Sequence, residues 1–494
     1  MMPLLCASRR VIARCVLPVL VGPNTALTRA SNMGGWVSGM RAHAWAGCAG
    51  FATARAGLRT GEPHPGCARP ARPGPGSGRA GGGASPASAV PPGAASGYGA
   101  AEPGRRDHPV HGPMRGARDR RTVPVPSRFA LLFAAQFAAL GVLMPFLPAV
   151  LKSHGLDARQ IALVLATGSA VRLLAAPAVG RGADGFGDAR TILVLAAACA
   201  TATVTGFAWA GGFAALLLVA ALHAMVNAPV IPLTDALCLS ASRERGFDYG
   251  RVRSAGSLAF ILAAVAAGQA VEWLGITSIV WLAALCLGLT ALSARGLPSL
   301  RGARGGRGGF RAPFASAAFR RILPLSALIQ GSHALYYGFG TLHWQAAGLS
   351  PGVIGLLWAE GVVAEVALFL WGRPLVERLG APGLALLAAG AGVLRWGVMA
   401  ETTWLPALAA AQLLHALTFG AQHLAAMRVL GGLPPAQAAT AQTLHASLGV
   451  GLASGLLTFA SGPLYAALGG AGFWAMAGLC ALALPLAWRL RRVG

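Results

Sequence analysis

Twelve long apolar runs follow one another from Phe129 to the end of the sequence. A helix rises about 1.5 Å per residue, so about 20 apolar residues cross the ~30 Å of hydrocarbon in a bilayer. The runs occupy residues 128–150, 158–180, 190–210, 213–240, 253–271, 277–294, 322–344, 352–372, 382–400, 404–429, 438–462 and 471–490. The chain is 55% hydrophobic and only 11% charged. We therefore predict an all-α membrane protein with twelve transmembrane helices.

Arginine indicates how these helices are oriented. The net charge of +25 is almost wholly due to arginine, since Lys152 is the only lysine. Links on the side of the amino terminus, with the carboxyl-terminal tail, hold nineteen arginines, whereas the opposite links hold only Lys152 and Arg159. Positive residues accumulate in cytoplasmic links, so we expect a multi-pass protein of the cytoplasmic (inner) membrane with both termini in the cytoplasm. The arginines form no single basic face, and we expect no nucleic-acid partner.

Composition divides the chain into four parts. Residues 1–126 are rich in Gly, Pro, Ala and Arg and cannot bury enough apolar surface to become ordered, so we expect a disordered low-complexity segment. It could imitate a transit peptide or act as a basic tail on an anionic membrane surface. We favour a third interpretation, in which translation starts downstream, for example at Met114. Residues 127–294 and 322–494 then form two six-helix bundles, joined by a basic cytoplasmic linker at 295–321.

The two halves echo each other. An acid stands three residues before a glycine after the second run, at Asp184 and Gly187, and again after the eighth run, at Glu377 and Gly380. Duplicated six-helix halves with a site between them at mid-membrane are a carrier architecture. We therefore expect two pseudo-symmetric bundles.

Ionisable side chains interrupt the apolar runs. The eight are Arg172, His223, Asp235, His333, Glu360, Glu365, Arg395 and His415. On insertion scales an acid or arginine at the bilayer centre costs about 3 kcal/mol, so the five acids and arginines would together cost about 15 kcal/mol facing lipid. They must instead face a protein-lined or watery interior, pair with each other, or titrate. Acids beside histidines and arginines are what a proton-coupled carrier requires.

Three acids are candidates for proton coupling: Glu365, Glu360 and Asp235. Glu360 and Glu365 lie about 140° apart around a helix, so a regular helix cannot direct both at one point. Burial favours the protonated form of a carboxyl group, and an approaching arginine reverses this, so alternating access could load and release a proton. We favour Glu365, with Glu360 second. A permanent structural ion pair is an equally good interpretation of any single acid.

Two stripes of polar and aromatic residues suit a carboxylate attached to a phenyl ring. The seventh run carries Gln330, His333 and Tyr337 on one side, with Tyr336 at the edge. The tenth run carries Gln412, His415, Phe419 and Gln422. The alternative is that neighbouring helices simply satisfy these polar groups.

Two arginines are candidates for holding a substrate carboxylate through a bidentate contact. Arg172 lies near mid-depth in the second run, and Arg395 lies in the outer part of the ninth. We favour Arg172 on depth alone. Asn227 in the fourth run is a further substrate candidate, and Pro229 and Pro232 should distort the helix beyond it.

The link after the second run carries Gly180-x-x-x-Asp184-x-x-Gly187-x-x-Arg190. Glycines permit a tight turn between helices, and Asp184 can meet a helix N-terminus or an arginine. This spacing resembles the cytoplasmic signature of the major facilitator superfamily, which implies a gating role. We place Arg251 with these gating residues. The alternative is an ordinary solvated turn.

A more specific resemblance is carried by several strings of residues. They are Pro232-Leu233-Thr234-Asp235-Ala236-Leu237, Asp248-Tyr249-Gly250-Arg251-Val252-Arg253, Gln330-Gly331-Ser332-His333-Ala334-Leu335-Tyr336-Tyr337-Gly338-Phe339, Trp358-Ala359-Glu360-Gly361-Val362-Val363-Ala364-Glu365 and Arg395-Trp396-Gly397. These strings resemble the phenylpropionate permease branch of that superfamily. The resemblance implies proton-driven uptake of 3-phenylpropionate or a similar aromatic acid.

Together these patterns predict a carrier that imports a small organic acid with protons by alternating access, as a monomer in the lipid bilayer. The same fold could instead serve as a nucleoside or sugar symporter or a drug exporter, and a receptor that binds without flux is a remote alternative. The sequence has no nucleotide-binding loop, no hydrolase motif and no Cys/His spacing typical of a metal site. We therefore expect no enzyme activity, no cofactor and no metal.

Overall fold

A computed structural model describes residues 124–186, 188–298 and 309–491, with 176–186, 435 and 439 described by their backbone alone. Every regular element in these ranges is a helix. The first half contains α5 (Val125–Ser153), α6 (Ala158–Phe186), α7 (Ala189–Trp209), α8 (Gly212–Asn227), α9 (Val230–Arg245), α10 (Tyr249–Leu274) and α11 (Ser278–Arg295). The residues of the predicted low-complexity segment before 124, and 299–308 of the predicted linker, lie outside the description.

The second half contains more and shorter helices. They are η1 (Ala312–Ala315), α12 (Ala317–Gly331), α13 (Ala334–Ala346), α14 (Pro351–Trp371), α15 (Arg373–Glu401), α16 (Leu405–Leu413), η2 (Ala416–Ala421), α17 (Gln422–Gly431), α18 (Pro435–Leu444), η3 (His445–Leu452), α19 (Ala453–Leu468), η4 (Gly469–Gly472) and α20 (Phe473–Leu490). Both η2 and η3 are π-helical, with one wide turn inside an otherwise α-helical run.

Nine stretches of the described residues are long and apolar enough to cross a membrane, by length and composition. The seventh and tenth predicted runs are not among them because each is divided into shorter helices, and the last two runs count as one stretch, Ala436–Leu490. The count of twelve therefore stays a prediction, and it fits this arrangement.

Local chemistry explains two of the interruptions. The predicted distortion of the fourth run is confirmed, because α8 ends at Asn227 and α9 begins at Val230, around a proline that has no N–H to donate. In α15, Gly380 has a φ of +62°, a backbone conformation that glycine adopts without strain. The chain bends there, which separates residues 373–379 from the apolar part of α15.

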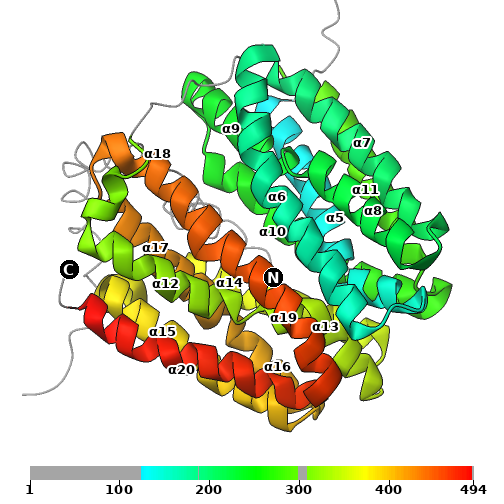
Figure 1. Ribbon diagram of the computed structural model, residues 1–494. Coiled ribbons are helices and arrows are strands. Elements are labelled where there is room, and N and C mark those ends of the chain that lie inside the picture. The colour runs from blue at the N-terminus through cyan, green and yellow to red at the C-terminus, as the bar shows by residue number, and fades with distance from the viewer. Residues whose placement is uncertain (1–123, 187, 299–308, 492–494) are drawn as a thin grey trace, which may run out of the picture. The chain divides into compact units, whose positions relative to one another are not determined.

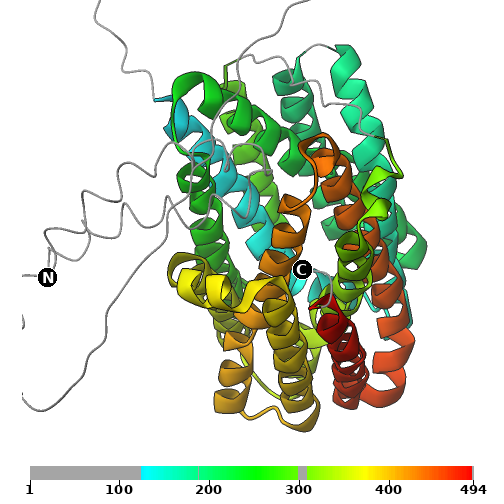
Figure 2. The ribbon, with the colours of Figure 1, turned by 90° about the vertical axis from the view of Figure 1, so that its left-hand side faces the viewer.

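The two halves pack internally and also against each other. Figure 1 shows α5–α11 gathered together and α12–α20 gathered together. In the second half α20, red in Figure 2, packs lengthwise against α15. Across the halves, α10 packs against α14, α6 against α19, and α5 against α13. These three helix pairs form the seam between the halves.

The apolar cores reveal a difference between the two ends of the bundle. We call the end with links 154–157, 210–211, 275–277, 347–350, 402–404 and 469–472 the arginine-poor end, and the opposite end the arginine-rich end. One buried cluster joins both halves toward the arginine-poor end, with members such as Phe146 and Leu151 beside Phe339 and Trp344. Toward the arginine-rich end each half has its own cluster. The halves are therefore packed closed at the arginine-poor end.

Candidate functional site

The seventh predicted run breaks where its side chains bond to their own backbone. Ser332 donates its hydroxyl to the carbonyl of Ile329 at 2.7 Å. The Nδ1 atom of His333 lies 3.1 Å from the same carbonyl and 3.3 Å from that of Gln330. Such local bonds compete with the helical ladder, so α12 ends at Gly331 and α13 restarts at Ala334. The break holds the His333 ring inside the second bundle, where it is fully buried.

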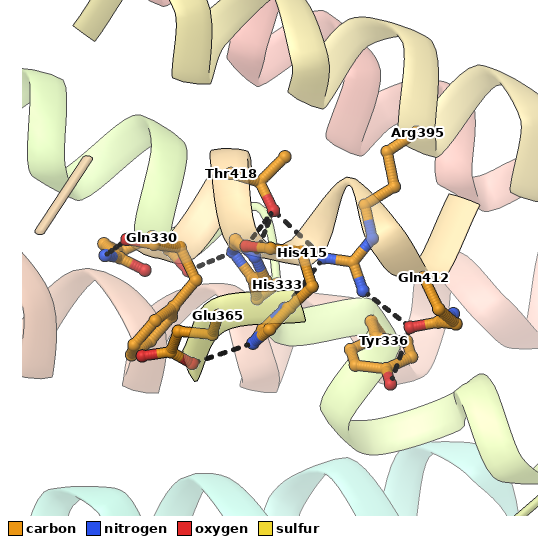
Figure 3. A network of polar contacts seen from close by, with 9 residues as sticks. Gln330, His333, Tyr336, Glu365, Arg395, Gln412, His415 and Thr418 are labelled. Atoms are coloured by element: carbon orange, nitrogen blue, oxygen red, sulfur yellow. Dashed lines mark hydrogen bonds and ion pairs between the residues drawn. The ribbon is translucent and has the colours of Figure 1, made fainter. Parts of the chain in front are cut away.

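Arg395 is the centre of a buried polar network, which Figure 3 shows. Its Nη1 atom donates to Nδ1 of His415 at 3.1 Å and to the hydroxyl of Thr418 at 3.0 Å. Its Nη2 atom donates to the amide oxygen of Gln412 at 2.9 Å, and the Tyr336 hydroxyl donates to that same oxygen at 3.2 Å. The Arg395 side chain is fully buried, and each of these acceptors is an uncharged group.

Glu365 joins this network through His415. A guanidinium group has no acceptor atom, so Nδ1 of His415 must accept from Arg395, and the ring proton of a neutral imidazole is then on Nε2. That Nε2 atom lies 3.7 Å from the Glu365 carboxylate. Gly361 of α14 faces His415, where a Cβ atom would lie 3.4 Å from the ring, in ordinary van der Waals contact. The result is a row of three groups, Glu365, His415 and Arg395.

Two hydrogen-bond donors in this network lack an acceptor among the described residues. They are Nε of Arg395 and the amide nitrogen of Gln412, both buried. A buried cation without a neighbouring carboxylate is costly, since several kcal/mol of hydration are lost. No described carboxylate lies within ion-pair distance of Arg395, and the one that reaches it through His415 belongs to Glu365. The site therefore suits an acceptor that carries negative charge.

Aromatic rings surround the Arg395 guanidinium group. The ring centroids of Tyr336 and Trp396 lie 4.9 and 4.5 Å from it. The Tyr336 ring also stacks on Trp358, with centroids 4.5 Å apart. His415 stacks on Phe419 at 5.3 Å. These faces offer apolar and cation–π contacts beside the charged centre.

Several predicted site residues meet in this network, and others do not. Those brought together are Glu365, Arg395, His415, His333, Tyr336, Tyr337, Gln330 and Phe419: Tyr337 stacks on His333, and Gln330 donates to the Phe419 carbonyl. Gln422 instead donates to Ser326, which also bonds to His445. The Glu360 side chain takes part in none of the hydrogen bonds or ion pairs found among the described residues, whereas that of Glu365 contacts His415.

The first half holds the remaining candidates. Asp235 accepts from the Tyr249 hydroxyl at 2.8 Å and lies 3.6 Å from Arg253, whose guanidinium group covers the Phe137 ring at 3.8 Å. Arg172 is exposed and donates to Ser169 of its own helix at 3.3 Å. Asn227 lies half-buried at the end of α8. None of these joins the Arg395 network.

The four gating candidates among the described residues lie at the arginine-rich end. Gly180 and Asp184 belong to α6, their side chains are not described, and Gly187 lies outside the described residues. Arg190 donates to the Leu297 carbonyl at 3.3 Å. The backbone N–H of Arg251 donates to Asp248, which caps α10.

The acid that caps α7 is Asp188. It accepts from the Thr191 hydroxyl at 2.6 Å and from the backbone N–H of Arg190 at 3.2 Å. The Thr191 hydrogen bond is the main reason why the pKa of Asp188 lies below its ordinary value. Asp188 was not among the residues predicted from the sequence, although an acid just before an apolar helical run is a recognisable capping signal.

Polar residues of the network were missed as well. Thr418 contacts Arg395 and also His333, at 3.1 Å. Trp396 donates to Ser332 at 2.9 Å. A single threonine in an apolar run is an ordinary helix residue by sequence, and only its spacing of three from His415 hinted at a shared face.

Comparison with known proteins defines the class. The protein-family model described as "MFS_1 like family" matches residues 128–476, so the chain belongs to this family of major facilitator superfamily transporters. These proteins are transporters and not enzymes. The fold and the family together identify a multi-pass membrane transporter that binds a small molecule.

Two relatives and one solved structure show which individual proteins this chain is similar to. A probable 3-phenylpropionic acid transporter of Escherichia coli (strain K12) is 35% identical over 360 residues, which cover 70% of this chain and 93% of that protein. A maltose permease of Geobacillus stearothermophilus is 28% identical over 357 residues, which cover 71% of this chain and 89% of that protein. The crystal structure of nucleoside transporter NupG is similar with a TM-score of 0.65 at 15% identity, covering 75% of this chain and 99% of that one, which shows the fold alone.

Proposed function

We propose that this protein imports a small aromatic carboxylate, such as 3-phenylpropionate, together with protons. The observation that carries the proposal is the row formed by Glu365, His415 and Arg395, in which a buried cation is one imidazole away from an acid. In this proposal Arg395 binds the substrate carboxylate, and Glu365 carries the proton. Arg172, which depth in the sequence favoured, is exposed, and the hydrogen bond found for its side chain among the described residues is to Ser169 of its own helix.

The row links the two ligands by charge. In this proposal an ionised Glu365, one imidazole ring away from Arg395, partly offsets the guanidinium charge, so a second anion gains little there. When Glu365 is protonated, Arg395 is left uncompensated and attracts a carboxylate strongly. Proton and anion therefore bind together, which is the requirement for symport. The donors on Arg395 and Gln412 that lack acceptors would face the carboxylate oxygens.

Aromatic contacts account for the preferred shape of the substrate. The Tyr336 and Trp396 rings lie over the guanidinium group, and Phe419 stacks on His415, which bonds to that group. A phenyl ring attached to the carboxylate by a short chain can stack on such faces, with about 1 kcal/mol for each well-placed pair. The E. coli relative, named a probable 3-phenylpropionic acid transporter, supports this substrate class.

The direction of insertion follows from the arginines. We place both termini in the cytoplasm, the arginine-poor end outside, and the protein in the inner membrane as a monomer, because the links of the arginine-rich end hold nearly all the link arginines. Closure at the arginine-poor end then corresponds to a carrier that is shut toward the outside.

A test uses the purified protein in liposomes. Uptake of labelled 3-phenylpropionate should require an inwardly directed proton gradient and should stop when a protonophore removes it. The second candidate is a sugar symporter, which the maltose permease relative favours, and a nucleoside symporter of the same fold is tested alongside it. Unlabelled maltose and uridine should fail to compete. Competition by either of them, or uptake indifferent to the proton gradient, would refute the proposed substrate or the proposed coupling respectively.

A further inference from the structure

A series of buried contacts leads from Arg395 toward the arginine-poor end. The Gln412 amide oxygen accepts from Arg395 at 2.9 Å and from the Tyr336 hydroxyl at 3.2 Å. The Tyr336 ring lies flat against the Trp358 indole, at 4.5 Å between centroids and 25° between planes. Arg395, Gln412 and Tyr336 are each almost wholly buried. The Gln412 amide is therefore connected to Trp358 through one residue, Tyr336.

Trp358 continues the series to the seam between the halves. Its indole N–H donates to the Thr341 hydroxyl at 3.0 Å, and that hydroxyl donates to the Pro145 carbonyl at 2.6 Å. Pro145 belongs to α5 of the first half, whereas Thr341 belongs to α13 of the second. A hydroxyl group has one proton, so the Trp358 donor leaves Thr341 free to direct that proton at Pro145. The indole thus sets the orientation of the bond that crosses the seam.

Other contacts close the same end without reaching the Arg395 site. Gly268 of α10 lies against the carbonyl of Pro351, where a side chain would not fit. The Glu272 carboxylate accepts from the backbone N–H of Gly352 at 3.1 Å, at the start of α14. These contacts hold α10 against α14. The Thr341 contact differs because it is continuous with Arg395 through Trp358, Tyr336 and Gln412.

We propose that Thr341 and Trp358 couple binding at Arg395 to closure of the arginine-poor end. A carboxylate that engages Arg395 and the free amide nitrogen of Gln412 fixes the Gln412 amide. Its oxygen then keeps Tyr336, and hence Trp358, in the position that orients Thr341 toward Pro145. Ligand binding therefore stabilises the closed seam. The proposal rests on the proposed function in placing the ligand at Arg395, and it treats Thr341 and Trp358 as positioning residues that do not touch the ligand.

The experiment measures the seam directly, by distance between spin labels on α5 and just after α13. Lys152 and Ala347 are both exposed at the arginine-poor end, and labelled cysteines at these positions report the separation of the two helices. The full-length chain is used with its native cysteines replaced, after uptake has been verified. Thr341→Val should raise the ratio of long to short distances by about threefold to tenfold without ligand, as expected for loss of one buried hydrogen bond.

Three further variants provide controls and a second test. Thr341→Ser keeps the hydroxyl and should match the parent chain. Thr290→Val removes a similarly buried hydroxyl, which among the described residues bonds only to Cys286 of its own helix, and should also match the parent. Trp358→Phe keeps an aromatic ring against Tyr336 but loses the indole N–H. In the parent chain 3-phenylpropionate should increase the fraction of molecules that show the short distance, and in Trp358→Phe this response should be lost.

The outcomes separate this proposal from the proposed function. If Thr341→Val matches Thr290→Val, or if Trp358→Phe responds to ligand as the parent does, the coupling role is refuted. If the parent chain binds the ligand without any change in the distances, the coupling role is refuted as well. If the parent chain does not bind 3-phenylpropionate, the proposed function fails, and the ligand-free comparison still decides whether Thr341 holds the seam.

Discussion

The Glu365 carboxylate lies 3.7 Å from the Nε2 atom of His415, which is longer than a hydrogen bond and within the distance of an ion pair. A contact of this length can tighten or part with a small movement of α14 against the π-helical segment η2. It also links Glu365 to Arg395, because the other ring nitrogen of His415 accepts from Arg395 at 3.1 Å. Proton coupling, as proposed, therefore depends most directly on Glu365 and His415.

Replacement of Glu365 by glutamine should separate coupling from binding. The glutamine side chain is neutral at every pH, as a protonated Glu365 is, so the Glu365→Gln carrier behaves as if it were always loaded with the proton. We expect accumulation driven by a proton gradient to be abolished, and exchange of labelled for unlabelled substrate to persist. Glu360→Gln is the matched control in the same helix and should retain accumulation. Undiminished accumulation in Glu365→Gln would remove this acid from the mechanism.

Replacement of Arg395 by lysine should weaken substrate binding. Lysine keeps the charge but loses the fork of donors that reaches His415, Thr418 and Gln412 together. The loss of charge-assisted hydrogen bonds is worth about 1.5–3 kcal/mol, which raises the dissociation constant by about tenfold to a hundredfold. Binding to the purified protein can be followed by calorimetry. Arg172→Lys serves as the comparison, and an equal or larger effect there would shift the carboxylate site to Arg172.

Packing between α15 and α20 should be sensitive to one glycine and indifferent to its neighbour. A Cβ atom on Gly392 would collide with the sulfur of Cys480, whereas one on Gly390 would meet nothing within 4 Å. Gly392→Ala should therefore destabilise the protein by about 1–3 kcal/mol, as overpacking does. Gly390→Ala should be neutral or slightly stabilising, because alanine favours the helix. Thermal unfolding in detergent compares the two, and equal midpoints would contradict this packing.

Asp188 should make the stability of the folded protein depend on pH. Its pKa lies below the ordinary value in the folded protein, mainly because Thr191 donates to it. A carboxyl group of this kind stabilises the folded state above its unfolded pKa, and the contribution is lost as the pH falls through its folded pKa. Between pH 7 and pH 3 the thermal midpoint of Asp188→Asn should therefore fall less than that of the parent chain. An equal fall of the thermal midpoint in the variant and in the parent chain would show that the Asp188 charge does not contribute to stability.

The sequence was a good guide to elements and a poor guide to contacts. The lengths of the apolar runs predicted the helices. Pro229 predicted the break between α8 and α9, because proline lacks the N–H that a helix requires. The break before Ala334 was not predicted, because it depends on which backbone carbonyl the His333 side chain hydrogen-bonds to. Depth along a run favoured Arg172 over Arg395, but depth does not tell which side of a helix faces its neighbours. Only the packing of α15 against η2 placed Arg395 beside His415.

The π-helical segment Ala416–Ala421 has a consequence for comparing this chain with its relatives. A wide turn accommodates one residue more than an α-helical turn, so the helix on either side keeps its face while the chain gains a residue. A homologue without the wide turn should be one residue shorter between His415 and Gln422. A one-residue gap at that place in an alignment then indicates that the homologue has an α-helical turn there. If the gap is left out, the residues on one side of the turn are aligned with the wrong neighbours, by one position.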